Sequence, residues 1–399
     1  MTFRRLRIAV LNRTFSPTAG GAERYSIALV EQLAAKHEIH VFAQSIEHDW
    51  PGVTYHRVSM PMRRPRWINQ LWFATATWWA TRKRPGTASS GGTGFDVVHS
   101  HENTWHGDVQ TAHVLPVKHN LFQGRTGMRR ALRWLKVLTS PRLLVYLGLE
   151  RLRYAVKPGR AVAVTSDSLM AIFKATYPAA AGMTSVLTPG IILPAMPISD
   201  AHRDAARQQL GLPQGRPCIL FVGNDFRKKG LSTLIDTLCA LPDQVILAVV
   251  GSSAQLPGFR QQAEAAGLGS RVFFLGALGD VSNAYRAADC LAHPTLEDTF
   301  AMVVLEAMAH GLPVVLSSSK YCGIAGLLEN GSNALILDDP RDANGLGGAL
   351  KLLLDPDFSA RLGREARAFS EKFEWGGIAA KQEKLYYAAA NARRAQEGV

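Results

Sequence analysis

The sequence of 399 residues is poor in cysteine and has no long apolar run. Its four cysteines include no CxxC pair and all lie in the second half: Cys218, Cys239, Cys290 and Cys322. This favours reduced, buried thiols over a disulfide framework or a zinc site. Residues 67–80 form a segment too short and too polar to span a bilayer. The start, MTFRRLRIAVLN, shows no signal-peptide cleavage site, so we expect a cytoplasmic protein.

Acidic residues are scarce in the first half of the chain. Residues 1–199 contain 25 Lys and Arg against 10 Asp and Glu, a balance of +15, whereas residues 200–399 contain 20 against 22, a balance of −2. The two halves are therefore expected to meet different partners. A basic half attracts phosphate-bearing surfaces such as anionic lipid, acidic glycolipid or nucleic acid.

Short β-branched runs alternate with helical patterns along the whole chain, which predicts βαβ units around a parallel sheet in each half. The expected strands are residues 7–11, 39–43, 96–100, 161–165 and 185–189, then 218–223, 245–251, 272–276, 290–294, 313–317 and 334–338. The proline-containing segment 194–215 is the expected linker. Residues 375–395 are predicted to form a final amphipathic helix.

The stretch HPTLEDTFAMVVLEAMAHGLPVV, residues 293–315, places acids within an apolar run. Asp298 or Thr299 is a plausible N-cap for a helix over residues 300–310. We expect unpaired backbone N–H groups at Phe300, Ala301 and Met302, at the carboxyl end of a sheet where anions bind. Glu306 lies about 12 Å along the helix axis from Asp298. The two acids could hold two ends of an extended ligand, or they could be a cap and an exposed helix acid.

Two glycine-containing loops follow buried strands. In FVGNDFRKKGLSTLI, residues 221–235, the side chains of Arg227, Lys228 and Lys229 could neutralise a diphosphate leaving group, although three adjacent basic residues are often a solvated loop. In FSPTAGGAERYS, Gly20 and Gly21 allow close approach to a ligand before a helix from Ala22, or they form an ordinary turn. That loop has neither GxGxxG nor P-loop spacing.

Two other patterns point away from metal chemistry. The histidines at 99, 101, 106 and 113 lack the spacing of a metal site, although one of them is expected in a ligand crevice. The DPD triplet at residues 355–357 follows a helical pattern and is assigned to a turn.

Five weak motifs occur in one order: GGAER, FDVVHSH, SVLTPGI, the VGxxxxxKG loop, and the acid-rich helix ending in LEAMAHGLPVV. Together they resemble the family-4 glycosyltransferases, most closely the lipopolysaccharide-core hexose transferases. The resemblance implies an α/β GT-B fold in which two Rossmann-like domains face a central cleft. The implied domains are residues 1–195 for the acceptor and membrane, residues 196–374 for the nucleotide-sugar donor, and residues 375–399 as a helix returning to the N-terminal domain.

The resemblance also assigns roles. The E-x7-E motif of the family falls on Asp298 and Glu306, for the donor sugar hydroxyls and the nucleotide ribose. Lys229 matches a phosphate-binding lysine, Gly20 and Gly21 match the loop beside the pyrophosphate, and His113 falls near the anomeric carbon. The helix start at Thr299, Phe300 and Ala301 completes the donor site. Two positions depart from the pattern: Asp298 replaces glutamate beside a competing Glu297, and Asn224 replaces an arginine, leaving Arg227 or Lys228 to supply that charge.

The implied reaction retains the anomeric configuration, needs no metal or other cofactor, and passes through an oxocarbenium-like sugar without a covalent intermediate. It would move a hexose from a nucleotide-sugar to a membrane-associated glycan or glycolipid in lipopolysaccharide or exopolysaccharide assembly. A nucleotide-sugar epimerase or a phosphorylase of the same fold is an alternative, although no lysine site for pyridoxal phosphate is identifiable. A nucleic-acid-binding protein would explain the basic half, but no recognised module is present and no nucleic-acid partner is expected.

Two basic segments carry aromatic or apolar residues, RRPRWINQLWFATATWWATRKR at 63–84 and RTGMRRALRWLKVL at 125–138. Rings at headgroup level beside Arg and Lys are typical of a membrane interface, although core helices with a solvated basic rim would also fit. The favoured interpretation is peripheral attachment to an anionic surface, the inner face of the cytoplasmic membrane, where a lipid-linked acceptor is presented.

Overall fold

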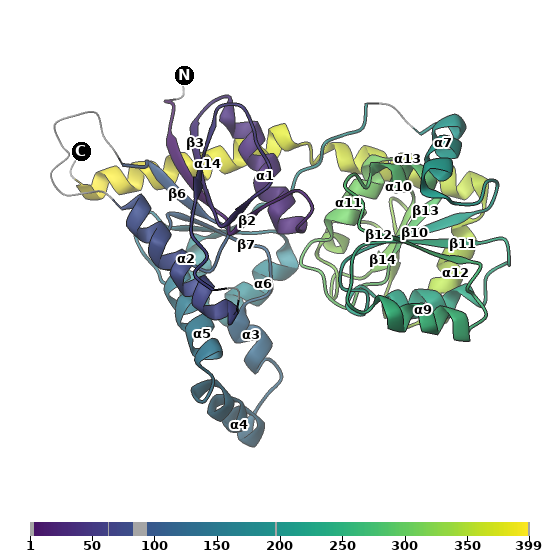
Figure 1. Cartoon of the computed structure of the whole chain (residues 1–399), viewed down its shortest axis with the longest axis horizontal. Helices are drawn as coiled ribbons and strands as arrows, with labels where there is room; N and C mark the ends of the chain where they lie inside the picture. The colour runs from purple at the N-terminus through teal and green to yellow at the C-terminus, as the bar shows by residue number, and fades with distance from the viewer. Residues whose placement is uncertain (1–3, 63, 83–93, 196–197, 398–399) are drawn as a thin grey trace. The chain divides into compact units, whose positions relative to one another are not determined.

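The computed structural model describes residues 4–62, 64–82, 94–195 and 198–397. The chain divides into two compact units: unit 1 is Met1–Thr188 with Trp375–Val399, and unit 2 is Pro189–Glu374. Each unit contains one large sheet of parallel strands covered by helices (Figure 1). This confirms the predicted α/β class with two parallel sheets.

Unit 1 has a seven-stranded sheet in the order β5-β3-β1-β6-β7-β8-β9. Its strands are β1 (Arg7–Leu11), β3 (Glu38–Ala43), β5 (Val53–Arg57), β6 (Val97–Ser100), β7 (Val109–Ala112), β8 (Ala161–Val164) and β9 (Thr184–Val186), and β2 (Thr14–Phe15) pairs separately with β4 (Ser45–Ile46). Its helices are α1 (Gly21–Ala34), α2 (Arg66–Thr81), α3 (Val117–Phe122), α4 (Gly127–Leu138), α5 (Pro141–Arg153), α6 (Asp167–Thr176), the 3-10 helix η1 (Pro178–Met183) and α14 (Trp375–Glu397).

Unit 2 has a six-stranded sheet in the order β12-β11-β10-β13-β14-β15. Its strands are β10 (Cys218–Val222), β11 (Ile246–Val250), β12 (Val272–Gly276), β13 (Cys290–His293), β14 (Val314–Ser317) and β15 (Leu335–Leu337). Its helices are α7 (Asp200–Leu210), α8 (Leu231–Leu238), α9 (Leu256–Ala265), α10 (Ser282–Ala287), α11 (Met302–Ala309), α12 (Ala343–Leu353) and α13 (Pro356–Glu371), with the 3-10 helix η2 (Gly323–Leu327). Apolar clusters fill both faces of this sheet, as parallel strands require.

All eleven predicted strands occur, with ends that differ by up to three residues. Two further strands of the large sheets, β5 and β7, lack the apolar runs on which the prediction relied. In β7 the polar side chains are fully buried because they have partners. Gln110 accepts a hydrogen bond from Arg153 at 3.0 Å, and Thr111 bonds the His99 ring at 2.7 Å. Tertiary hydrogen bonds thus allow a polar strand inside a core.

The C-terminal helix α14 packs in unit 1, as expected from the resemblance (Figure 1). Trp375, Ile378 and Tyr386 join the buried cluster formed by β1, β3 and α1. The buried Tyr386 hydroxyl also lies 2.7 Å from Nδ1 of His99, at the end of β6. The helix therefore contributes both apolar contacts and a buried hydrogen bond to the unit.

The Tyr386–His99 contact should stabilise unit 1. Tyr386→Phe leaves a buried imidazole nitrogen without its partner, so we expect the free energy of unfolding to fall by about 1–3 kcal/mol. All eight tryptophans lie in unit 1, so urea unfolding followed by tryptophan fluorescence reports this unit. Tyr387→Phe is the matched control, because the Tyr387 hydroxyl donates to the Arg4 carbonyl at an exposed position and its loss should cost less than about 0.5 kcal/mol. Equal effects of the two changes would contradict the prediction.

Candidate functional site

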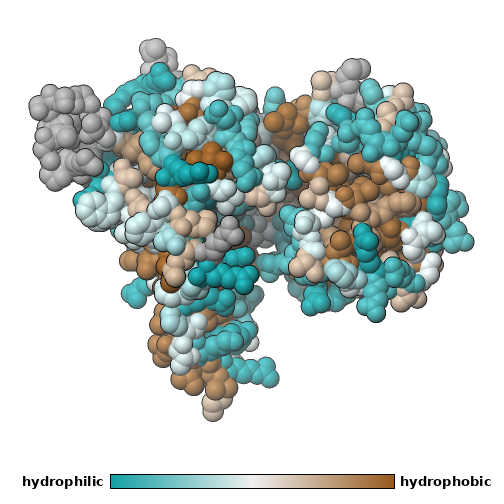
Figure 2. All heavy atoms as spheres, viewed as in Figure 1, coloured by the Kyte–Doolittle hydropathy of each residue, from teal (hydrophilic) through white to brown (hydrophobic). Residues whose placement is uncertain are grey.

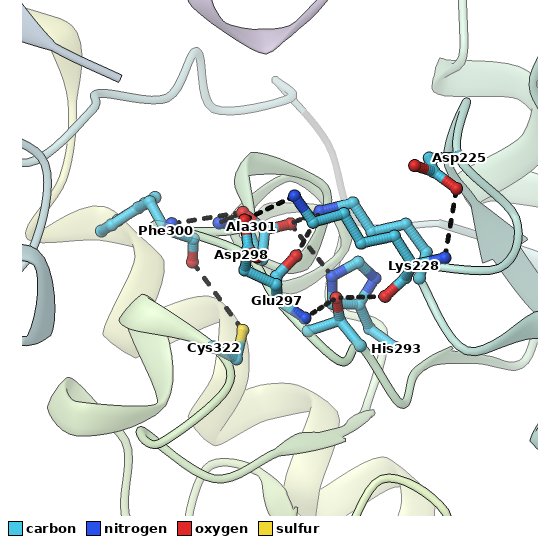
Figure 3. A network of polar contacts seen from close by, with 10 residues as sticks. Asp225, Lys228, His293, Glu297, Asp298, Phe300, Ala301 and Cys322 are labelled. Atoms are coloured by element: carbon cyan, nitrogen blue, oxygen red, sulfur yellow. Dashed lines mark hydrogen bonds and ion pairs between the residues drawn. The ribbon is translucent and has the colours of Figure 1, made fainter. Parts of the chain in front are cut away.

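The candidate donor site lies at the carboxyl ends of β10 and β13, which are neighbours in the unit 2 sheet. The loop after β10 carries Lys228 and Lys229, and the loop after β13 carries the acids (Figure 3). The two loops are bonded to each other, since the Leu296 N–H donates to the Lys228 carbonyl at 2.8 Å. Gly230, with φ of 80°, makes this approach possible because a Cβ there would lie 1.9 Å from the Pro294 carbonyl oxygen.

Asp298 is the centre of the polar network in Figure 3. Its Oδ2 lies 2.5 Å from Nζ of Lys229 and 3.2 Å from Nε2 of His293. Its Oδ1 accepts hydrogen bonds from the backbone N–H groups of Phe300 and Ala301, at 3.2 and 2.8 Å. Burial alone would raise the pKa of Asp298, but the Lys229 ammonium and the His293 ring hold that pKa well below its usual value. The carboxylate is therefore ionised and makes four hydrogen bonds.

This cap corrects one expectation. The N–H groups of Phe300 and Ala301 are not unpaired, because Asp298 accepts from both. The regular helix α11 also begins at Met302 rather than at Phe300, since Ala301 has φ of 74° and lies in the left-handed region. A left-handed alanine costs roughly 1–2 kcal/mol relative to an ordinary helical residue. Among the residues that the structure describes, Ala301 is the one non-glycine residue with positive φ.

Glu306, on α11, has a protein partner for the carboxylate that the apolar sequence left unexplained. Its Oε2 accepts a hydrogen bond from the Tyr285 hydroxyl at 2.6 Å, and the side chain is partly exposed between the buried residues Leu305 and Ala307. Tyr285, in α10, was not predicted as part of the site. The acid is thus held in place at the edge of the core rather than within it.

The remaining donor-loop residues surround this network. Lys228 pairs with Glu297, with 2.5 Å between Nζ and Oε1, and the Glu297 side chain is 39% exposed. Arg227 and Asn224 are exposed, and the Asn224 side chain accepts from the Ser252 N–H at 3.1 Å. Thr299, between Asp298 and the N–H groups of Phe300 and Ala301 that donate to it, is partly exposed. Lys228 and Lys229 are therefore both neutralised by acids in this structure, whereas the Arg227 side chain extends into solvent.

Three predicted residues belong to unit 1. Gly20 is an extended residue directly before α1, and the helix begins at Gly21 rather than at Ala22. His113 follows β7, and its Nε2 lies 2.9 Å from Nδ1 of His101. Burial, followed by the charge of Arg153, lowers the pKa of His113 to about 3, so its ring is neutral at pH 7. These residues lie at the carboxyl side of their sheet, as the residues of unit 2 do in theirs.

Sequence reasoning missed His293. The residue ends β13, is fully buried, and bonds Asp298. Burial lowers the pKa of His293, so a neutral ring that donates through Nε2 fits the contact. Its sequence signal is a polar residue at the end of a buried strand, directly before Pro294. Elsewhere, Asp355 of the DPD triplet caps α13 by accepting from the Phe358 N–H at 2.8 Å, and Pro356 and Asp357 are the first residues of that helix, so the triplet begins a helix instead of forming only a turn.

Comparisons with known proteins find similarity to glycosyltransferases along both halves of the chain. A family model for glycosyl transferases group 1 matches residues 202–369, and a model for glycosyltransferase family 4 matches residues 19–193. A D-inositol 3-phosphate glycosyltransferase of Xylanimonas cellulosilytica is 34% identical over 223 residues, which are 53% of this chain and 52% of that protein. The lipopolysaccharide glucosyltransferase WaaG of Escherichia coli K12 is 29% identical over 216 residues, 52% of this chain and 57% of that protein.

The chain therefore spans about half the length of the curated relatives it matches. The crystal structure of WaaG, a glycosyltransferase involved in lipopolysaccharide biosynthesis, superposes with a TM-score of 0.80 at 23% identity, covering 95% of this chain and 99% of that one. This similarity confirms the expected GT-B fold.

The strained residue before α11 gives a direct test of the local geometry. Ala301→Gly removes the steric strain of a left-handed alanine at φ of 74°, but glycine also increases the conformational entropy of the unfolded chain. Because the first effect is the larger one, we expect the free energy of unfolding to rise by about 0.5–1 kcal/mol. Ala307→Gly, inside the same helix, is the control and should destabilise by about 1 kcal/mol or more. Urea unfolding followed by far-UV circular dichroism measures both changes, with tryptophan fluorescence as the unaffected reference for unit 1. A loss of stability in Ala301→Gly would contradict the left-handed assignment.

Proposed function

Because this chain belongs to the family 4 (group 1) glycosyltransferases, we propose that it transfers a hexose from a nucleotide-sugar with retention of configuration. The proposed acceptor is a lipid-linked glycan or glycolipid at the inner face of the cytoplasmic membrane, as in lipopolysaccharide or exopolysaccharide assembly. The relative named for lipopolysaccharide supports this acceptor class, and another relative is named for D-inositol 3-phosphate.

The observation that carries the proposal is the ion pair of Lys229 and Asp298 at the carboxyl ends of two neighbouring parallel strands. Ligands of open α/β sheets bind at this edge. A diphosphate entering here would compete with Asp298 for the Lys229 ammonium, which lies on the rim of the network and is 21% exposed. Lys229, with Arg227 and the Asn224 amide beside it, would stabilise the negative charge that develops on the leaving diphosphate.

The acids would hold the rest of the donor. Glu306, oriented by Tyr285, would accept hydrogen bonds from the ribose hydroxyls. Asp298 would hold the sugar hydroxyls and keep the loop from Thr299 to Ala301 in place through its cap. Glu297, which is more exposed, is the competing choice for the sugar contact. Glu297→Gln, at the more exposed of the two side chains, separates the two: it should raise KM for the donor if Glu297 touches the sugar and leave KM unchanged if Asp298 does.

The residues of unit 1 would act on the reacting centre. Gly20 and Gly21 would allow the backbone to approach the pyrophosphate. The neutral ring of His113 would hydrogen-bond the transferred sugar near its anomeric carbon while an oxocarbenium-like sugar is attacked by the acceptor. The proposed chemistry uses no metal ion and no cofactor, and its positive charges come from side chains.

A nucleotide-sugar epimerase of the same fold is the second candidate, because its donor contacts would be alike. The two activities differ in their requirement for an acceptor hydroxyl. Nucleotide release that depends on an added glycan or glycolipid acceptor supports transfer, whereas sugar isomerisation without acceptor supports the epimerase.

Peripheral membrane attachment is supported by α4, which packs on α3 and α5 and buries only Val137. Its exposed apolar side chains gather along one side, with Met128 75%, Leu132 59%, Leu135 59% and Leu138 64% exposed. The basic residues of α4 are Arg129, Arg130, Arg133 and Lys136. Figure 2 shows apolar atoms at the end of unit 1 where Figure 1 places α4. Apolar residues beside a basic row fit a helix that lies in an anionic interface.

The aromatic helix α2 carries further exposed apolar side chains. Its Trp72 and Trp79 are 43% and 59% exposed, while Phe73 and Thr77 are fully buried. One side of the helix thus fits the membrane-interface interpretation, and the other side fits the core-helix interpretation. Arg63, Lys83 and Arg84 of the predicted basic clusters lie outside the described residues. In the part of the chain that the structure describes, no helix has the length and apolar character of a membrane span.

Donor binding is the first test. Thermal-shift measurements with UDP, GDP and ADP should identify one stabilising nucleotide, and Lys229→Met should weaken its binding by about tenfold through the loss of a charge-assisted phosphate contact. Glu306→Gln should weaken binding of that nucleotide and leave binding of inorganic diphosphate unchanged. Lys351→Met, an exposed lysine on α12, is the control. No response to any nucleotide would contradict the proposed donor class.

Membrane binding is the second test. The wild-type chain should float with vesicles rich in phosphatidylglycerol at low salt and dissociate as salt rises. Replacing Leu132, Leu135 and Leu138 by Ser should abolish flotation, because the apolar contacts of α4 are lost. Leu352→Ser, at a leucine on α12 that is also more than half exposed (51%), should float like the wild type. Flotation that survives the triple change would contradict attachment through α4.

A further inference from the structure

Unit 1 contains a cavity of about 450 Å³ that the donor site and the α4 surface do not include. It lies where Asp108 precedes β7 and Arg160 precedes β8. Because the strands are parallel, this is the amino edge of the sheet, opposite the carboxyl side at which His113 follows β7. The end of α2 and the side of α14 close the cavity. A ligand bound here would therefore not compete with a donor that contacts the residues at the carboxyl side of the unit 1 sheet.

The cavity is strongly cationic. Four of its lining side chains are basic, Arg82, Lys157, Arg160 and Arg393, against one acid, Asp108. Asp108 is already engaged, since it accepts from the Val98 N–H at 2.8 Å and from Arg393 at 3.2 Å. The Arg160 guanidinium bonds only neutral carbonyl groups among its described partners, including those of Leu152 and Trp105 at 2.8 and 2.9 Å. Within the described part of the chain, most of the positive charge of this cavity therefore has no carboxylate to neutralise it.

His106 supplies an independent sign that something binds there. Both of its ring nitrogens are buried, and neither has a hydrogen-bond partner among the described residues. Burial, with the charges of Arg160 and Lys157, lowers the pKa of His106 to about 3. The ring is then neutral, with one N–H to donate and one nitrogen to accept. Buried polar groups in folded proteins nearly always have partners, so the ring requires a water or a ligand that carries both acceptor and donor groups.

We propose that this cavity binds the phosphate group of a phosphomonoester. A phosphomonoester offers several oxygen acceptors to Arg and Lys side chains that approach from different elements, and its monoanion also has a hydroxyl for the imidazole. The site is placed beside the exposed Trp79 of α2, with Arg82 stacked 3.6 Å above that ring. Either a lipid with a phosphomonoester headgroup or a soluble sugar phosphate could carry this group.

Titrations of the full-length chain test the site. Inorganic phosphate and glycerol 3-phosphate are the soluble probes, and vesicles of phosphatidylcholine with or without phosphatidic acid are the lipid probe. Binding is followed by calorimetry for the soluble probes and by flotation for the vesicles. The ring ¹⁵N shifts of His106 report a new hydrogen bond to the phosphate.

Arg82 and Lys157 are exposed, so the double change Arg82→Gln, Lys157→Gln should leave the fold intact. We expect it to weaken phosphomonoester binding by about tenfold or more. Arg151→Gln, Lys174→Gln is the control of equal charge on exposed helix positions of unit 1. The triple Leu→Ser variant of α4 removes general membrane attachment and thereby separates this site from the surface proposed above.

The outcomes distinguish the sources. If the Arg82, Lys157 variant loses binding of the soluble probes, the cavity binds a soluble phosphomonoester. If the variant loses the extra affinity of the wild type for vesicles with phosphatidic acid over phosphatidylcholine alone, the cavity binds a lipid headgroup. Equal losses of probe binding in the variant and its control would overturn the proposal. So would ring ¹⁵N chemical shifts of His106 that do not change when any of the probes is added. Nucleotide binding by unit 2 should be the same in all of these variants as in the wild type. A negative result at this cavity would therefore leave the proposed transferase activity standing.

Discussion

The donor site depends on the contact of two loops at Gly230 and Pro294. Since no side chain fits between the Gly230 Cα and the Pro294 carbonyl, the loop after β10 lies directly on the loop after β13. That approach places the Lys229 ammonium against the Asp298 carboxylate. A larger residue at position 230 would separate the loops and, with them, the charges on which donor binding is proposed to rest.

Around this contact the site is organised before any ligand arrives. Asp298 fixes the start of α11 through two backbone bonds and orders Lys229 through its other oxygen, while His293 supports it from the core. Such an arrangement fixes the side chains in advance, but it also ties the lysine to an acid. A diphosphate with two charges can compete for that lysine more strongly than a neutral ligand can. The same pair would therefore favour charged donors over free sugars.

Unit 1 shows a different use of polar residues. His99, Thr111 and Tyr386 form buried hydrogen bonds that join two strands to α14, whereas one side of α4 has apolar residues that are more than half exposed. The first group makes the C-terminal helix part of the unit. The second group leaves a surface whose burial would require a partner of mixed apolar and anionic character, which the basic charge of this half also favours.

The sequence by itself determined the architecture. The alternation of strands and helices and the final helix could be predicted, because hydrophobic periodicity is a local property. The acids at positions 298 and 306 stand out in the sequence because they interrupt an apolar run. It did not reveal β7, whose Gln110 and Thr111 are buried only because distant residues bond them. It also did not reveal the partners His293 and Tyr285, the cap that occupies the Phe300 and Ala301 N–H groups, or the basic cavity around His106. Those features join residues that are far apart in the chain, as Tyr285 and Glu306 are, or depend on how a loop folds back on itself, as the contacts of Asp298 with His293 and Ala301 do, and only the packed tertiary structure decides them.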